Sequence, residues 1–445
     1  MTATEHVQRS LARDPADAAG WLDLAILRHV GEAPSGEVAA ILRRAAMLDA
    51  ANLQVWTRRA QIHFDQGLFA AGVRAGRAAA SLAPAEPTAL HAMAEALAAA
   101  DGPAAALPWL DRLVALAPDI PVYRLSRGMK RLAAGIWQRG WSDYEARRVR
   151  PGMRMPPDEI APLPVAALAG RSLLIHHEQG FGDTIQFMRF LPDLIRHGAR
   201  VHLAVPAVLR GLAADMPGAD GLALIDPVDV AGARVDLALP VMSLPALLGL
   251  SPEGAPYLAA STAQRARWAA VLADLPGLRV GLCWSGDPRL DAQVNVRMTD
   301  RRRSVPLSAL GAITAVQGAT FISLQHRHRA DEALDAHGIR DVSADIGDFA
   351  DLAGLIANLD LVITVDTAVA HLAGALGART WMLNRFDGCW RWGRGSATTR
   401  WYNSMTIFNQ ATPMDWSVPL AEVRNSLRVL IADQAAAIAA RKTLP

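Results

Sequence analysis

The sequence predicts an α + α/β protein in which an all-α repeat region precedes two α/β units. Ala50, Pro84 and Pro118 each close a similar Leu-Asp-Ala or Leu-Ala-Pro stretch, and successive ones are 34 residues apart. This period is typical of helix-turn-helix repeats that stack into a solenoid. Beyond about residue 169, short apolar runs alternate with helical patterns, as in parallel sheets covered by helices.

Residues 1–150 form the predicted repeat domain. Trp21, Trp56 and Leu90 fall at matching places near the start of the first helix of three repeats. Stacked repeats of this kind commonly present a concave surface to a peptide or protein. An Ala-rich antiparallel bundle without true repeats is the alternative, and the doubled 34-residue spacing disfavours it.

The boundaries of the remaining segments follow from proline and strand patterns. Five prolines interrupt the segment after residue 150 and prevent a continuous helix there. A polar loop is expected at residues 287–303. The predicted segments are a linker (151–168), a first α/β half (169–272), a second α/β half (273–416) and a terminal helix (417–445).

Composition excludes several classes of protein. A chain of 445 residues needs two or three cores, and a formal charge of +2 argues against a polyanion binder with a wholly basic surface. Cys283 and Cys389 offer neither a disulfide framework nor a metal-ligand spacing. No basic segment followed by an apolar core begins the sequence, and no run of 18 apolar residues occurs. We therefore expect a cytoplasmic protein without stable membrane insertion.

The stretch 360–377 contains the clearest candidate for a ligand site. Leu361–Val365 is an apolar run typical of a strand buried on both faces. Asp366 ends it as a predicted N-cap, and 367–376 reads as a helix. A helix that starts at the carboxyl end of a parallel strand attracts anions such as phosphate, and His371 shares a helix face with Thr367. The alternative is that Asp366 only caps and His371 only packs.

A second candidate loop follows the predicted strand 171–176. Glu-Gln-Gly-Phe-Gly-Asp-Thr (178–184) leads into a helix, and its two glycines allow a sharp turn and a close approach to a ligand. Asp183 is suited to accept a proton from a reacting hydroxyl. A helix N-cap is its alternative role.

Together these loops resemble those of a known group of enzymes. Glu-Gln-Gly-Phe-Gly-Asp-Thr-Ile-Gln-Phe (178–187) and Val-Asp-Thr-Ala-Val-Ala-His-Leu-Ala-Gly-Ala-Leu-Gly (365–377) are similar to segments of bacterial GT-B glycosyltransferases that carry tetratricopeptide repeats (TPR), a heptosyltransferase-like and O-GlcNAc-transferase-like group. Phe181 stands where that group usually has Leu. The resemblance implies a TPR solenoid followed by a GT-B fold of two Rossmann-like domains, the first on the acceptor side and the second on the nucleotide-sugar side. It also implies that the terminal helix (417–445) is a crossover helix that returns to the first half.

The resemblance also implies roles for individual residues. Asp183 would be the catalytic base, with Glu178 as the alternative. A solvated surface run is the alternative for the arginines at 301–303. The residues expected to bind the donor or its phosphates are Gly182, Arg303, Ser304, Gln325, Asp366, Thr367, Ala368 and His371. Those expected to contact the acceptor or the sugar are Gln179, Trp390 and Arg391, and core packing is the alternative for Trp390 and Arg391.

The implied reaction moves a sugar from a nucleotide sugar to a hydroxyl of a protein acceptor, such as flagellin or another surface protein, with inversion. The acceptor would bind the concave face of the TPR solenoid. No Asp-x-Asp pair occurs in the sequence, so no metal and no other cofactor is expected, and no nucleic-acid partner is expected. A glycolipid heptosyltransferase and an inactive TPR scaffold are the alternatives.

Overall fold

The computed structural model describes residues 2–149, 163–232, 234–287, 291–325 and 334–442. The chain divides into two compact units, Met1–Glu159 with Pro288–Arg302, and Ile160–Asp287 with Arg303–Pro445. Pro151, Pro156, Pro157 and Pro162 of the predicted linker lie outside the described residues. Pro164 precedes a 3-10 turn, Val165–Leu168.

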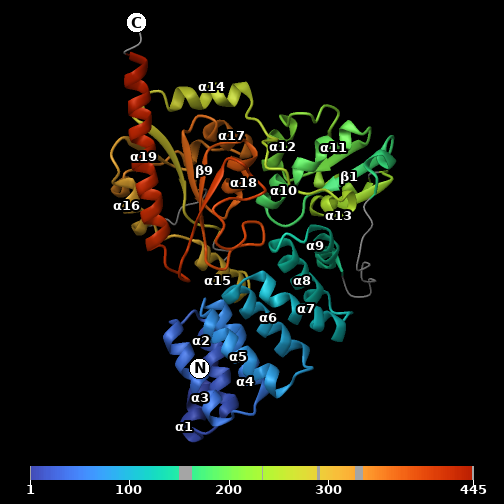
Figure 1. Cartoon of the computed structure of the whole chain (residues 1–445), viewed down its shortest axis with the longest axis vertical. Helices are drawn as coiled ribbons and strands as arrows, with labels where there is room; N and C mark the ends of the chain where they lie inside the picture. Colours follow the sequence, from blue (N-terminus) through green and yellow to red (C-terminus); the bar gives the residue numbers. More distant parts are fainter. Residues whose placement is uncertain (1, 150–162, 233, 288–290, 326–333, 443–445) are drawn as a thin grey trace. The chain divides into compact units, whose positions relative to one another are not determined.

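The first unit contains a run of antiparallel helix pairs, as predicted for a TPR solenoid (Figure 1). The indole N–H of Trp21 donates to Pro15 O and that of Trp56 to Ala50 O, the same bond in two successive repeats. Leu90 at the third matching place is fully buried. The helices are α1 (Ala3–Arg13), α2 (Ala18–Val30), α3 (Ser35–Leu48), α4 (Leu53–Asp65), α5 (Phe69–Leu82), α6 (Pro87–Asp101), α7 (Pro103–Leu116), α8 (Pro121–Ala133) and α9 (Trp137–Tyr144), followed by the 3-10 turn Glu145–Arg148.

One helix of the first unit comes from far along the chain. α15 (Val294–Arg303) lies where a polar loop was expected, and all but its last residue belongs to the solenoid unit. Arg297 forms an ion pair with Glu32 at 2.6 Å and donates to Val30 O. Arg302 bonds Asp65 O and lies over the Phe64 ring. The sequence did not indicate this helix because arginine contacts, rather than an apolar stripe, dock it.

The second unit begins with a small parallel sheet. Its strands are β1 (Ser172–His176), β2 (Arg200–Ala204), β3 (Ala223–Ile225) and β4 (Leu237–Pro240), in the order β3-β2-β1-β4. The connecting helices are α10 (Phe181–Phe187), α11 (Leu191–Arg196), α12 (Ala207–Ala214) and α13 (Leu244–Leu248). The helix expected after residue 184 is not continuous, because a 3-10 turn, Met188–Phe190, separates α10 from α11 before Pro192.

The second sheet is parallel throughout and has six strands in the order β10-β9-β8-β5-β6-β7. This is the strand order of a doubly wound Rossmann-like sheet, whose order reverses between β5 and β8. The strands are β5 (Leu278–Cys283), β6 (Ala319–Ser323), β7 (Ile339–Arg340), β8 (Leu361–Val365), β9 (Thr380–Asn384) and β10 (Met405–Asn409). The helices are α14 (Thr262–Val271), α16 (Gly311–Thr314), α17 (Phe349–Ile356), α18 (Ala368–Ala375) and α19 (Ser417–Lys442). Two such sheets confirm the predicted pair of Rossmann-like halves.

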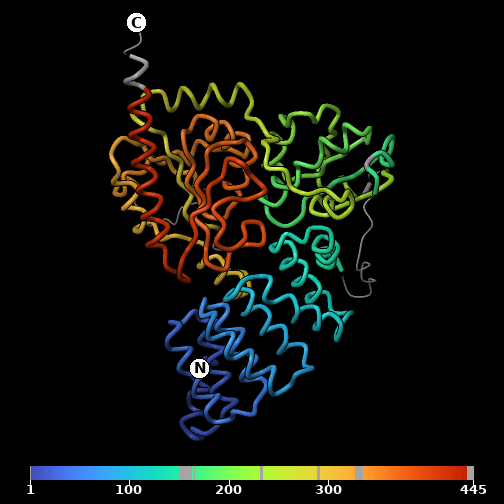
Figure 2. The backbone as a smooth tube through the Cα atoms, in the orientation of Figure 1, coloured from blue at the N-terminus to red at the C-terminus, as the bar shows by residue number. Residues whose placement is uncertain are grey.

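The predicted terminal helix is α19, which Figure 2 shows as the red end of the tube. It packs against α16, β9 and β10 of the second half. Its Ile431 side chain covers Gly318. Within the described residues, no helix combines the length and apolar character needed to cross a membrane.

Close helix packing in the solenoid predicts opposite effects for one substitution at two glycines. A Cβ at Gly76 in α5 would lie 2.8 Å from the Cα of Met93, whereas a Cβ at Gly36 in α3 would meet nothing within 4 Å. Gly76→Ala should lower the free energy of unfolding by about 1–3 kcal/mol because a backbone atom must move. Gly36→Ala should raise it by up to about 1 kcal/mol. Urea unfolding of both variants measures the difference, and shifts of the same sign would contradict the packing.

Candidate active site

The first site loop connects β1 to α10. Gly180 is the N-cap of α10, and Asp183 lies three residues later, where its Oδ2 accepts a bond from the Gly180 N–H at 2.9 Å. Asp183 is therefore not the N-cap residue itself. Gln179 is exposed and has a φ of 63°, a left-handed conformation that costs a non-glycine residue roughly 1–2 kcal/mol. The half-buried Glu178 precedes it.

The second site loop connects β8 to α18. The N-cap of α18 is Thr367, not Asp366 as expected, and the Thr367 side chain makes no capping bond. Its hydroxyl lies instead 3.3 Å from Thr364 Oγ1 and 3.6 Å from Cys283 Sγ. The first backbone N–H groups of a helix lack partners within the helix. Because Thr367 does not cap them, the start of α18 is suited to receive an anion.

The starts of α10 and α18 touch at Gly182. A Cβ at this buried glycine would lie 2.8 Å from the His371 ring and 3.2 Å from the Cα of Ala368. Only glycine fits such an approach without displacing α18. Asp183, in the first turn of α10, is thereby held next to the helix end that is suited to an anion.

Arg391 joins the two halves through Asp183. Its Nη2 forms a short ion pair with Asp183 Oδ1, and its Nε donates to Gln186 Oε1 at 2.6 Å. The guanidinium lies 4.2 Å from the centre of the Trp390 ring, and Trp390 packs edge-on against Trp401. Trp390 is only 9% exposed, so in this structure it supports Arg391 rather than offering an open stacking face.

Arg303 lies beside the start of α18. Its Nη1 donates to Asp366 O at 3.2 Å. Burial alone would raise the pKa of the Asp366 carboxyl, but Arg303 overrides it, with help from other neighbours that include Arg385, so that this pKa is lowered. The other two arginines of the run lie elsewhere, since Arg301 is exposed and Arg302 docks in the solenoid unit.

Ser304 and Gln325 both hold the loop after β5. The Gly286 N–H donates to Ser304 Oγ. The Gln325 amide makes two bonds to the Ser285 backbone, accepting from its N–H at 3.1 Å and donating to its carbonyl at 3.0 Å. Gln325 is 6% exposed. In this structure the two side chains shape the β5 loop near Arg303.

His371 is buried behind the contact between α10 and α18. Its Nδ1 lies 2.9 Å from the Tyr402 hydroxyl, and its ring packs against Trp392. Burial, followed by the Arg391 charge, lowers the pKa of His371 to about 4. The imidazole is therefore neutral at pH 7 and can offer a hydrogen bond, but not a charge, to a phosphate.

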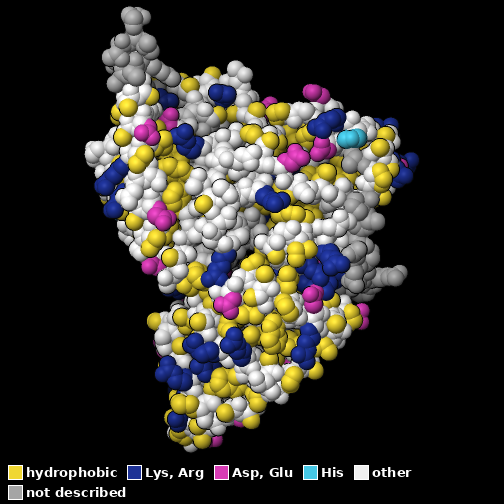
Figure 3. Space-filling view, in the orientation of Figure 1, with side chains coloured by type: hydrophobic (Ala, Val, Ile, Leu, Met, Phe, Trp, Pro, Cys, Tyr) yellow, Lys and Arg dark blue, Asp and Glu magenta, His cyan; other side chains and the backbone are white. Residues whose placement is uncertain are grey.

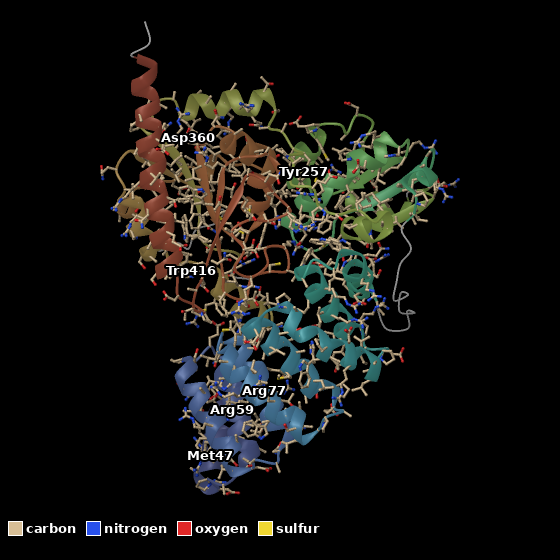
Figure 4. All side chains as sticks on the ribbon, in the orientation of Figure 1. Met47, Arg59, Arg77, Tyr257, Asp360 and Trp416 are labelled. Atoms are coloured by element: carbon tan, nitrogen blue, oxygen red, sulfur yellow. The ribbon has the colours of Figure 1, made fainter. Side chains whose placement is uncertain are left out.

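Sequence reasoning missed a buried arginine that connects the halves. All three donor groups of Arg189 bond backbone carbonyls, those of Gln186, Glu253 and Trp401. Its guanidinium lies 4.6 Å from the ring centre of Tyr257, which Figure 4 labels, and 5.0 Å from that of Tyr402. Nothing local in the sequence indicates this role, because the partners lie up to 212 residues away.

The described residues contain no group of three or more His, Cys, Asp or Glu side chains placed to hold a metal ion. The cationic and polar groups that could contact a phosphate are those around Arg303 and the start of α18.

The fold and the site loops define a solenoid joined to two Rossmann-like halves, the layout of TPR-bearing GT-B glycosyltransferases. No family model matches the sequence. Protein FlbA of Caulobacter vibrioides is 27% identical over 348 residues, which are 70% of this chain and 55% of FlbA. The chain thus spans about half the length of this curated relative.

Solved structures are similar at lower identity. Escherichia coli ADP-heptose LPS heptosyltransferase II is 13% identical, with a TM-score of 0.41, over 59% of this chain and 99% of that one. A point mutant of Thermobaculum terrenum O-GlcNAc transferase is 12% identical, with a TM-score of 0.31, over 97% of this chain and 94% of that one.

The lowered pKa of His371 predicts acid sensitivity of the second unit. The folded value, about 4, lies below the ordinary 6.5, so the unfolded chain binds the proton more tightly. The free energy of unfolding should therefore fall as the pH drops from 6.5 to 4, by up to about 1.4 kcal/mol per pH unit from this group. His371→Gln should flatten that fall, as measured by hydrogen exchange resolved along the chain.

His63 provides the matched control, because burial lowers its pKa to about 4 within the solenoid unit. His63→Gln should flatten the acid dependence of the solenoid and leave that of the second unit unchanged. An identical slope for the second unit in wild type and His371→Gln would contradict the assignment.

Proposed function

We propose that the protein is an inverting, metal-independent glycosyltransferase that moves a sugar from a nucleotide sugar to a hydroxyl of a protein acceptor. The observation that carries this proposal is the contact at Gly182. It brings a carboxylate, Asp183, next to a helix start that is suited to an anion and flanked by Arg303. A base and a site for a charged leaving group are the two requirements of this reaction.

In the proposed reaction the acceptor oxygen attacks the anomeric carbon of the donor. The bond from that carbon to the phosphate oxygen breaks, and the nucleoside diphosphate leaves with the bonding electrons. The acceptor proton moves to the Asp183 carboxylate. Arg303 and the first N–H groups of α18, those of Ala368 and Val369, stabilise the negative charge on the leaving group.

Arg391 prepares Asp183 for this task. The ion pair with Arg391 and the bond from the Gly180 N–H together fix the orientation of the carboxylate. An acceptor hydroxyl that donates to Asp183 must share the carboxylate with Arg391 or displace it. Arg391 then becomes available to a hydroxyl or phosphate of the substrates, which agrees with the role that the resemblance implies.

The proposal that the acceptor is a protein is based on the solenoid. Helix repeats commonly bind peptides on their concave side, and we propose that the acceptor segment binds there. Flagellin or another surface protein is the acceptor class that the resemblance suggests.

Removing the base tests the reaction. Asp183→Asn keeps a side chain of the same shape and should lower kcat by about 10²–10⁴ while the dissociation constant for the donor nucleotide changes little. Turnover of a nucleotide-sugar panel, with nucleotide binding measured in parallel, separates the two effects. A variant with full activity would show that Asp183 is not the base.

Two arginines of the same run provide a matched pair for the leaving-group site. Arg303→Ala should weaken nucleoside diphosphate binding about ten- to a hundredfold, because a charge-assisted contact is lost. Arg301→Ala changes the charge equally at an exposed position and should leave binding unchanged. Thermal shifts with UDP, GDP, ADP, CMP and TDP measure both. If no nucleotide binds the wild type, the proposed function fails.

A further inference from the structure

A cavity of about 250 Å³ lies in the solenoid between α5 and α7. Ala80 and Leu90 belong to the buried core, and Trp109 packs against that core, so these apolar walls are fixed. The volume is below the roughly 300–1,000 Å³ of pockets that enclose whole small molecules and suits a single apolar side chain. Arg77 and Arg112, both exposed, also line the cavity, together with Ser81 and Pro84.

The cavity lies on one particular side of the solenoid. α2 packs against α4, and α4 against α6, so the first helices of successive repeats form one side. The second helices, α3, α5 and α7, form the other, which we call the second-helix side. Both arginines of the cavity come from α5 and α7 and therefore lie on the second-helix side, while Leu90 of α6 contributes to its wall.

Exposed arginines recur on successive helices of the second-helix side. Arg43 and Arg77 are 34 residues apart and hold the same place in α3 and α5, whereas Arg112 lies one residue past that place in α7, next to Asp111. Asp111 itself pairs with Arg127 and Arg131. We call these three residues the arginine ladder. Each lies before the last turn of its helix, where the helix dipole gives a cation little stabilisation.

The ladder is not neutralised by carboxylates. Other arginines of the solenoid are paired, as Arg28 is with Glu37 and as Arg127 and Arg131 are with Asp143. Across the part of the solenoid that the structure describes, no ion pair joins a ladder arginine to an acidic side chain.

Further cations strengthen the positive potential here. Arg74 is exposed one turn before Arg77. Figure 3 shows dark-blue Lys and Arg side chains among yellow apolar ones over the helical unit.

We propose that the second-helix side binds an extended acidic peptide segment, with one apolar side chain in the cavity between Arg77 and Arg112 and carboxylates on the arginine ladder. Guanidinium groups bind carboxylates through paired, charge-assisted bonds. The spacing of one arginine per repeat suits a segment that runs along the solenoid. The site is independent of the proposed sugar transfer, because it requires neither donor nor turnover.

A single-stranded nucleic acid fits these observations less well. Such ligands are bound by successive aromatic platforms on which bases stack, whereas this cavity has one tryptophan, Trp109, whose partly buried ring packs against the core.

Fluorescence anisotropy tests the proposal on the whole chain. The probe is a fluorescein-labelled peptide in which Glu alternates with Gly around one central Leu. Arg77→Glu with Arg112→Glu should weaken its binding at least about tenfold. Arg9→Glu with Arg13→Glu changes the net charge equally on exposed positions of α1 and should leave binding within about twofold. Circular dichroism confirms that both variants keep their helices.

Two altered peptides test whether binding requires both the apolar side chain and the carboxylates of the segment. Replacing the central Leu by Gly should weaken binding about tenfold, since an apolar side chain leaves the cavity, and replacing Glu by Lys should abolish it. Equal losses in the two double variants would overturn the proposal in favour of long-range attraction alone. Tighter binding of a single-stranded oligothymidine, lost in Arg77→Glu with Arg112→Glu, would overturn it in favour of a nucleic-acid surface.

Discussion

The absence of a side chain at Gly182 is the constraint on which the candidate site depends. It allows the turn that carries Asp183 to touch the first turn of α18. Each of these helices follows a strand beside the point where its own sheet reverses order, β1 in one half and β8 in the other. Arg391 and Arg189 then cross between the halves and bond partners near that contact. The base and the anion site can lie close together only because the turns at the starts of α10 and α18 touch each other.

Features that local sequence specifies were predicted correctly. The repeat period marks the solenoid because each repeat makes the same contacts at the same positions, as the matching indole bonds of Trp21 and Trp56 illustrate. β8 could be predicted from the sequence because a strand buried on both faces is apolar throughout. α15 could not be predicted from the sequence, since its docking relies on Arg297 and Arg302 rather than on apolar periodicity.

The candidate site was predictable only in part. The loops that carry Asp183 and Asp366 stand out because glycines and strand ends mark them. The cap of α18 was misassigned by one residue, since Asp366 and Thr367 are both good caps by type and only the backbone decides. The partners Gln186, Tyr402 and Arg189 act through contacts made by folding, as in the pair of Asp183 and Arg391 across 208 residues. No local pattern encodes such pairs.

The position of α15 has a consequence for the evolution of such chains. The chain belongs to the second unit up to Asp287 and again from Arg303, while the segment between them, with all of α15 but its last residue, belongs to the first. Recombination at the segment after α9 would transplant a solenoid without this helix, and would separate Arg297 from Glu32 and Arg302 from Asp65. The repeat region therefore cannot be exchanged between proteins as one continuous segment without losing these contacts. A hybrid protein would have to inherit two distant stretches of the gene together, one for α1–α9 and one for α15. The solenoid and the second unit are therefore expected to evolve together.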